Sequence, residues 1–308
     1  MTAPLLKWAG GKRQLLPSLR RFYPSSFDRY FEPFFGSGAV FFDLSGAGRL
    51  DGRESVLIDS NADLIGCYQM VRDRREEVAD ALAVLAEGHA AGGAAHYYAV
   101  RNDQFNPGRE ACRAPDGEMV YTPALAAMLI YLNRTGFNGL FRVNAGGRFN
   151  VPAGRYANPR IVDRRRLAQV ASALSGARVT LRVGEYSAVL DLARPGDFLY
   201  FDPPYAPSST TANFTSYTSR RFDDTAQAAL QRVAIALAHR GCHVVLSNST
   251  APPITALYDG NADAEAAGLR AHRVRARRAV NSKPSRRGPV DEYLITNVTP
   301  VSEHAMIG

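Results

Sequence analysis

The chain has 308 residues, enough for one large or two ordinary domains, and its hydrophobic and charged fractions of 46 % and 21 % are typical of a soluble globular protein. Its 37 lysines and arginines exceed its 29 acids, and the net charge of +8 favours a polyanionic partner without separating nucleic acid from a merely basic surface. The three cysteines lack disulfide or zinc spacing, no apolar run approaches a membrane span, and no signal-peptide core is present. We therefore expect a cytoplasmic protein with no membrane segment and no metal.

The first half of the chain begins as an α/β pattern and then changes character. Residues 29–46 have the pattern of a strand, a glycine loop and a helix, and residues 55–58 form a short apolar strand. From residue 64 the sequence becomes helical and alanine-rich, and residues 119–132 are typical of a buried helix. Residues 137–152 alternate apolar and polar side chains around a glycine-rich turn, which predicts a β-hairpin.

The α/β pattern returns from about residue 163. Residues 198–201 and 244–246 are predicted strands, and residues 225–239 form a predicted amphipathic helix that Asp223 or Asp224 caps and Gly241 ends. Two strand-like runs, around residues 270–280 and 293–297, close the chain, and residues 206–221 have the composition of a mobile loop. We therefore predict an α/β domain, residues 1–63 plus 163–308, which residues 64–162 interrupt.

The tetrapeptide Asp202-Pro203-Pro204-Tyr205 directly follows the apolar run of residues 198–201. The prolines end that strand and hold an acid and an aromatic side by side at the carboxyl edge of the sheet, where ligands bind in open α/β folds. Asp202 and the Pro203 carbonyl can each accept a hydrogen from the exocyclic amine of a flat nitrogen base, and Tyr205 can stack on that base. The amine could then attack a methyl donor. The alternative is that the prolines only begin a loop and Asp202 is a turn residue.

A glycine loop, Gly36-Ser37-Gly38, opens a predicted helix, and Asp59 ends the next predicted strand. Glycines let a ligand approach the backbone at a helix N-terminus, and an acid in the second position can accept a hydrogen bond from a ribose hydroxyl. The pair indicates an adenosine-bearing cofactor, although such a loop can also be purely geometric. A dinucleotide-dependent oxidoreductase fits as well, except that Phe41 stands where the third glycine of its motif would be.

Residues 119–162 contain five arginines and no acid. Arginine is the preferred reader of guanine in the major groove, and a two-stranded ribbon fits that groove. Phe137, in the predicted hairpin, could wedge between base pairs or fill the place of a flipped base. An ordinary basic hairpin with Phe137 in the core is the alternative. Eight further basic residues between 270 and 287 suggest phosphate neutralisation or a solvated face.

Taken together, the motifs resemble the Dam-type adenine-specific DNA methyltransferases, from residue 5 to about residue 295. The shared motifs are Lys7-Trp-Ala-Gly-Gly-Lys12, Glu32-Pro-Phe-Phe-Gly-Ser-Gly38, the segment of residues 133–150, and Asp202 to Tyr205. The resemblance implies a Rossmann-like methyltransferase sheet with an inserted, mostly helical target-recognition domain that carries the hairpin. The implied activity is transfer of a methyl group from S-adenosylmethionine to N6 of a flipped adenine in double-stranded DNA, with GATC as the favoured site. A longer GAT-containing site and a non-catalytic DNA-binding relative are the alternatives.

The same resemblance assigns residues. The S-adenosylmethionine pocket would be lined by Trp8, Lys12, Phe35, Gly36, Gly38, Asp59 and Asp202. The flipped adenine would be held by Asp202, Pro203 and Tyr205, and DNA would be contacted by Lys7, Arg134, Phe137, Asn138, Leu140, Arg142, Arg155 and Tyr156. Phe137 stands where other members have tyrosine, and residues 87–95 and 107–119 look like local additions. We expect a monomer of bacterial or phage origin, with a separate restriction endonuclease as an optional partner.

Related amines remain as rival substrates: cytosine N4, an RNA adenine and a glutamine side chain. Enzymes for the first and the last tend to have Ser or Asn where this chain has Asp202, and an RNA substrate would not call for the arginine-bearing hairpin. An oxidoreductase would leave Asp202 to Tyr205 unexplained.

Overall fold

The computed structural model describes residues 4–8, 10–114, 119–176, 178–206, 222–277 and 289–300. Nearly all of the predicted mobile loop, residues 207–221, and residues 278–287 of the basic stretch therefore lie outside the described residues.

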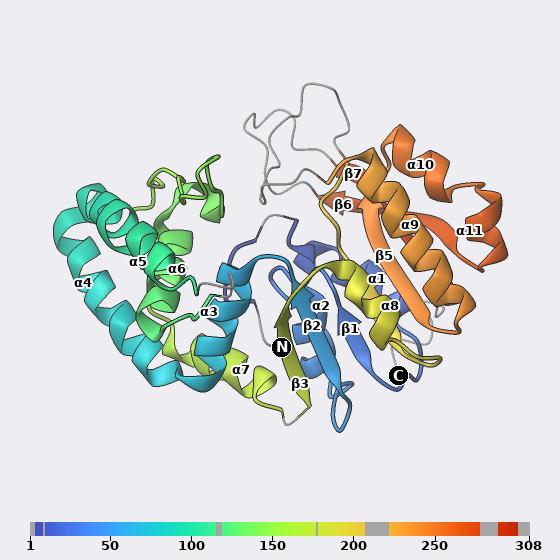
Figure 1. The fold of residues 1–308 in the computed structure, drawn as a ribbon, viewed down its shortest axis with the longest axis horizontal. Coiled ribbons are helices and arrows are strands. Elements are labelled where there is room, and N and C mark those ends of the chain that lie inside the picture. The colour runs from blue at the N-terminus through green and yellow to red at the C-terminus, as the bar shows by residue number, and fades with distance from the viewer. Residues whose placement is uncertain are drawn as a thin grey trace.

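A seven-stranded sheet with the order β3-β2-β1-β4-β5-β7-β6 forms the centre of the fold (Figure 1). The strands are β1 (Tyr30–Glu32), β2 (Ser55–Asp59), β3 (Val179–Val183), β4 (Phe198–Phe201), β5 (His243–Ser249), β6 (Arg270–Arg277) and β7 (Pro289–Thr296). Strands β1 to β5 pair in parallel, and β7 is antiparallel to both of its neighbours. Because the chain leaves β1 first toward β2 and later returns to β4 on the other side, the topological switch point lies at the carboxyl ends of β1 and β4.

Helices cover both faces of the sheet. The helices on one face, together with those that lie to the side of the sheet, are α1 (Leu16–Leu19), α2 (Ala39–Gly46), α3 (Ala62–Asp73), α4 (Arg75–Ala99), α5 (Asn106–Ala111), α6 (Pro123–Thr135) and α7 (Arg164–Leu174). Those on the other face are α8 (Val189–Leu192), α9 (Asp224–His239), α10 (Pro252–Tyr258) and α11 (Ala262–Ala266). Short 3₁₀ turns span Lys12–Gln14, Arg20–Phe22, Phe137–Gly139 and Tyr186–Ala188, and a π-helical segment, Val100–Phe105, joins α4 to α5.

The central strands are buried on both faces, so their side chains alternate between two cores. Tyr30, Phe198 and Tyr200 enter one core, and Phe31, Leu199 and Phe201 enter the other. The first core continues from the sheet through α3 into α4 and α6 without a break. Figure 1 shows α4, α5 and α6 gathered to one side of the sheet, and α3 packs against both the sheet and α6.

The predicted hairpin is present, but it is irregular. Its arms pair through the isolated antiparallel bridges Gly136↔Ala153 and Val143↔Phe149 rather than through a continuous ladder. The first arm is interrupted by the 3₁₀ turn Phe137–Gly139, in which Asn138 has a left-handed backbone with φ of 55°. The alternating sequence pattern predicted the hairpin but not this 3₁₀ turn.

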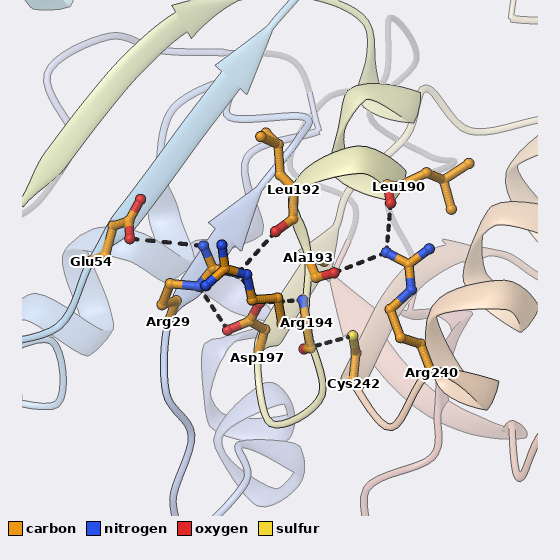
Figure 2. A network of polar contacts seen from close by, with 9 residues as sticks. All are labelled: Arg29, Glu54, Leu190, Leu192, Ala193, Arg194, Asp197, Arg240 and Cys242. Carbon is orange, nitrogen blue, oxygen red and sulfur yellow. Dashed lines mark hydrogen bonds and ion pairs between the residues drawn. The ribbon is translucent and has the colours of Figure 1, made fainter.

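A polar network at the amino edge of the sheet fastens the loop that precedes β4 (Figure 2). Arg29 pairs with Asp197, with 2.7 Å between Nη2 and Oδ2, and also donates to the Leu192 carbonyl. Arg240, which follows α9, donates to the carbonyls of Leu190 in α8 and of Ala193 just after it, and the Cys242 thiol donates to the Arg194 carbonyl. The amino edge is therefore occupied by structural contacts, and the carboxyl edge carries the candidate site. No helix within the described ranges is long and apolar enough to cross a membrane.

Candidate active site and nucleic-acid interface

The ends of parallel strands bring the predicted residues to one edge of the sheet. Strand β1 leads into the glycine loop, β2 ends at Asp59, and β4 is followed directly by Asp202. These strands pair in register, β2 with β1 and β1 with β4, so their carboxyl ends meet at the switch point.

The side-chain carboxylate of Asp59 accepts hydrogen bonds from the backbone of the glycine loop and of Asn61. The Gly36 N–H donates to Asp59 Oδ2 and the Asn61 N–H donates to Oδ1, each over 2.9 Å. Burial raises the pKa of Asp59 to about 6, and the two N–H donors oppose that shift. Gly38 has a φ of +67°, and a Cβ there would lie 2.5 Å from the Phe35 ring, so only glycine fits.

Glu32 supports this loop from below, a role that the sequence analysis did not assign. Its Oε2 accepts from the Phe41 N–H at 3.0 Å and from the Tyr30 hydroxyl at 2.7 Å. Phe41 lies in the first turn of α2, where backbone N–H groups lack helical partners. Burial raises the pKa of Glu32 well above its usual range. The signals in the sequence were its position at the end of an apolar strand and its place at the start of the shared motif of residues 32–38, and neither assigns this role.

Lys12 lies between Asp202 and Tyr205. Its Nζ is 2.7 Å from Asp202 Oδ1, 4.2 Å from the centroid of the Tyr205 ring, and 2.7 Å from the Gly10 carbonyl oxygen. Asp202 also accepts from Ser247 Oγ at 3.1 Å, a partner that β5 supplies. Burial raises the pKa of Asp202, while Lys12 and the Ser247 hydroxyl act in the opposite direction.

Two further contacts, also missed by the sequence analysis, fix the tetrapeptide. The Tyr205 hydroxyl donates to Glu292 Oε2 on β7 at 2.7 Å. Gln227 Nε2 on α9 donates to the Pro204 carbonyl at 2.9 Å, and Asn248 in turn donates to Gln227. The aromatic ring is thus held by its hydroxyl, and the turn is held by its backbone.

The N-terminal segment lies between this site and the hairpin. The Trp8 ring stacks on Phe141 with 5.6 Å between centroids, and a Cβ on Gly36 would come within 3.1 Å of Trp8 Cδ1. Lys7 exchanges two backbone hydrogen bonds with the buried side chain of Asn133, and its Nζ lies 4.7 Å from the Tyr156 ring centroid.

Apart from Lys7, the residues predicted to contact DNA fall into two groups. Phe137 is 50 % exposed and Tyr156 38 %, and Asn138, Arg142 and Arg155 are exposed as well. In the second group, Leu140 packs against the core. Arg134 donates to the backbone carbonyls of Arg160 and Leu5, and burial lowers its pKa. The contacts of this second group are made within the protein.

Phe35, which is predicted to line the cofactor pocket, lies between β1 and α2. Its ring is buried and packs edge-on against Phe41 and Tyr68, so its side chain belongs to the core beneath the glycine loop. Among the described residues, no three His, Cys, Asp or Glu side chains gather as a metal site would require.

Comparison with known proteins agrees with this geometry. The model of the D12 class N6 adenine-specific DNA methyltransferases matches residues 8–280. A type II methyltransferase of Lactococcus lactis subsp. cremoris is 35 % identical over 294 residues, which cover 96 % of this chain and 95 % of that protein. A type II methyltransferase of Methanocaldococcus jannaschii is 34 % identical and covers 96 % of this chain and 98 % of its own. The DNA adenine methylase of Escherichia coli is 34 % identical, over 94 % of this chain and 93 % of its own. The chain therefore belongs to the family of D12 class N6 adenine-specific DNA methyltransferases.

Proposed function

We propose that this DNA adenine methyltransferase takes its methyl group from S-adenosylmethionine and transfers it to N6 of an adenine flipped out of double-stranded DNA, with GATC as the favoured site. The observation that carries the proposal is the arrangement of Asp202, Lys12 and Tyr205 at the switch point, beside the loop that Asp59 holds. The family requires a methyl donor, and the adenosine of this donor needs the acceptor that Asp59 offers.

The residues around the glycine loop fit this donor. Each oxygen of Asp59 accepts one backbone N–H and keeps a lone pair for a ribose hydroxyl, and the carboxylate is partly exposed. Trp8 supplies an aromatic surface next to Gly36, and the backbone of Phe35 and Gly38 forms the loop itself. When bound, the donor supplies a methyl group on a positively charged sulfur.

Lys12 contacts Asp202 and Tyr205, the two side chains that we expect to contact the adenine. Its ammonium donates to the carboxylate and lies over the aromatic face, as the exocyclic amine and the ring of the base would. Base entry therefore requires Lys12 to leave at least one of these partners. Until then, Lys12 compensates the negative charge of Asp202 in the free enzyme.

Asp202 acts by position and charge. Its carboxylate and the Pro203 carbonyl accept the two hydrogens of the amine, which directs the nitrogen lone pair out of the ring plane. Tyr205, fixed through Glu292, keeps the base in one plane, which is an orientation effect. As the new N–C bond forms, the methyl–sulfur bond of the donor would break and leave S-adenosylhomocysteine. The methylated nitrogen is then acidic, and Asp202 receives one amine proton or passes it to water. A strong base is not needed.

The DNA-reading surface in this proposal is the exposed part of the hairpin, and residues 64–162 form the target-recognition domain. Phe137 would enter the base stack where the adenine leaves, and Arg142 would read a guanine. Asn138, Arg155 and Tyr156 lie exposed around them, and Lys7 contacts Tyr156. Leu140 and Arg134 would support this surface, and their direct contact with DNA stays a prediction.

The test is single-molecule sequencing with modified-base detection, applied to plasmid from a methylation-deficient host that expresses the chain. Methylated adenine at every GATC is the expected result. Methylated adenine confined to longer sites that contain GAT would support the second candidate. Methylation in an unrelated context would overturn the proposed role of the hairpin, and no methylated adenine would overturn the proposal as a whole.

A further inference from the structure

Side chains from the helical insert hold the second arm of the hairpin in place of a neighbouring strand. The Asn106 side chain donates to the Phe149 carbonyl at 3.0 Å and accepts from the Phe149 N–H at 2.8 Å. Tyr97 and Arg101 both donate to the Val151 carbonyl, at 3.0 and 2.9 Å. The backbone of this arm is therefore fixed from α4, the π-helical segment and α5.

Arg109, on α5, extends this support to the turn of the hairpin. Its Nη1 donates to the Gly147 carbonyl at 2.7 Å. Its Nε and Nη2 make a bidentate pair with the two oxygens of Asp63 on α3, also at 2.7 Å each. Arg109 is only 8 % exposed, and its guanidinium lies 5.9 Å from the Phe141 ring centroid. One buried side chain thus joins α3 to the hairpin turn and touches the aromatic side chain of the first arm.

Helix α3 begins at the cofactor side of the site. Its N-cap, Asn61, donates its backbone N–H to Asp59 and accepts from the Leu64 N–H with its side chain. Asp63 lies in the first turn of the same helix. The first arm of the hairpin reaches the glycine loop by another route, because Phe141 stacks on Trp8 and Trp8 packs near Gly36. Contacts therefore connect both arms of the hairpin to the elements that flank the proposed methyl-donor pocket.

We propose that Arg109 is a positioning residue that fixes the orientation of the target-reading hairpin relative to the methyl-donor side, and that it thereby determines how sharply the enzyme discriminates its site from sites with one base changed. This inference rests on the proposed role of the hairpin in reading DNA. The physical reason is the fork of the guanidinium, which satisfies a carboxylate with two donors and a carbonyl with a third. A buried ion pair is weak evidence for stability, and setting a register is its best-attested use.

The substitution Arg109→Lys separates this role from a charge effect. Lysine keeps the positive charge beside Asp63, but its single ammonium cannot replace the fork that also reaches Gly147. Arg113→Lys is the matched control, because Arg113 follows α5 directly and is exposed. For each protein, kcat/KM would be measured on the preferred site, as found by sequencing, and on single-base variants of it. Amide hydrogen exchange over residues 143–149 would be measured in the DNA-free protein.

Arg109→Lys is expected to lower the discrimination ratio about tenfold, within the range for residues that couple two sites, and to speed exchange in the hairpin turn. Arg113→Lys should leave both readouts within about twofold of wild type, and the cofactor affinity of either free variant should change by less than about twofold. Wild-type discrimination and exchange in Arg109→Lys would overturn the inference, as would equal losses in both variants. If Arg109→Lys fails to fold, Asp63→Asn must reduce discrimination in the same direction, because it releases the fork from α3. Absence of adenine methylation by the wild-type protein would count against the proposed function, and unchanged exchange in the turn would then still overturn the positioning role.

Discussion

The carboxyl edge of the sheet and the hairpin of the insert hold their functional side chains in different ways. At the sheet edge, β1, β2 and β4 end side by side, and neighbouring elements hold the predicted residues. Ser247 binds Asp202, Glu292 binds Tyr205, and the glycine loop binds Asp59. In the hairpin, isolated bridges and a hydrogen bond from Arg142 to Asn150 join the arms, and side chains from α4 and α5 hold the backbone carbonyls. The first arrangement fixes reacting groups within a rigid frame. The second fixes the scaffold and leaves Phe137 and Arg142 exposed to meet a partner.

Replacing Asp202 tests the rigid edge with the largest expected effect. Asp202→Ala should lower kcat by about 10³-fold or more, because it removes the charged acceptor of the amine hydrogens, and such preorganised groups are worth that much. DNA affinity in a gel-shift assay should stay close to wild type, since Asp202 lies at the sheet edge and the proposed reading groups lie in the hairpin. Substantial turnover by this variant would contradict the mechanism.

Arg142 tests the hairpin side of the comparison. Its Nε donates to the Asn150 side chain at 2.8 Å, so the guanidinium already lies ordered on the exposed surface. Arg142→Ala should cost ~1–3 kcal/mol in kcat/KM at the preferred site and relax specificity at one base position. Arg148→Ala, on the opposite arm of the hairpin, is the matched control. A uniform loss on all sequences, with a smaller salt dependence, would instead identify Arg142 as a phosphate contact.

The sequence predicted the positions at which strands end, and therefore most of the site. The buried run before Asp202, the strand before Asp59 and the capping of α9 by Asp223 are all in the structure, because strand ends and caps follow from local chemistry. The partners Ser247 and Glu292 could not be found in this way. They reach the site only because β5 pairs with β4 and β7 pairs with β5, an order that no local pattern encodes. The hairpin was placed correctly but expected to be regular, because its support comes from side chains distant in sequence.

Glu292 gives a moderate test of how the rigid edge is built. Glu292→Leu should lower kcat about tenfold, because the Tyr205 hydroxyl loses a charged acceptor and the ring loses its fixed orientation. Glu292→Gln keeps an acceptor oxygen and should restore most of that loss. Tyr205→Phe should resemble Glu292→Leu, and the double variant should lose little more than either single variant. Additive losses in steady-state kinetics would show that Glu292 acts independently of Tyr205.

The smallest expected effect is the pH dependence that Asp59 confers on binding of the methyl donor. The pKa of Asp59 is raised to about 6, and its ionised form is the stronger acceptor for the two backbone N–H groups and the ribose hydroxyls. Donor affinity should weaken about fourfold between pH 7 and pH 5.5 as the carboxylate takes up a proton.

The effect on folding has the opposite sign. Because the folded-state pKa lies above the unfolded value, Asp59 contributes stability at low pH that is lost as the pH rises through about 6. Calorimetric titration at the two pH values separates these effects. Protonation of Asp59 favours the folded protein, so weaker donor binding at pH 5.5 cannot result from unfolding linked to Asp59. Asp59→Asn should bind weakly at both pH values, and a pH dependence that survives in this variant would assign the titration to another group.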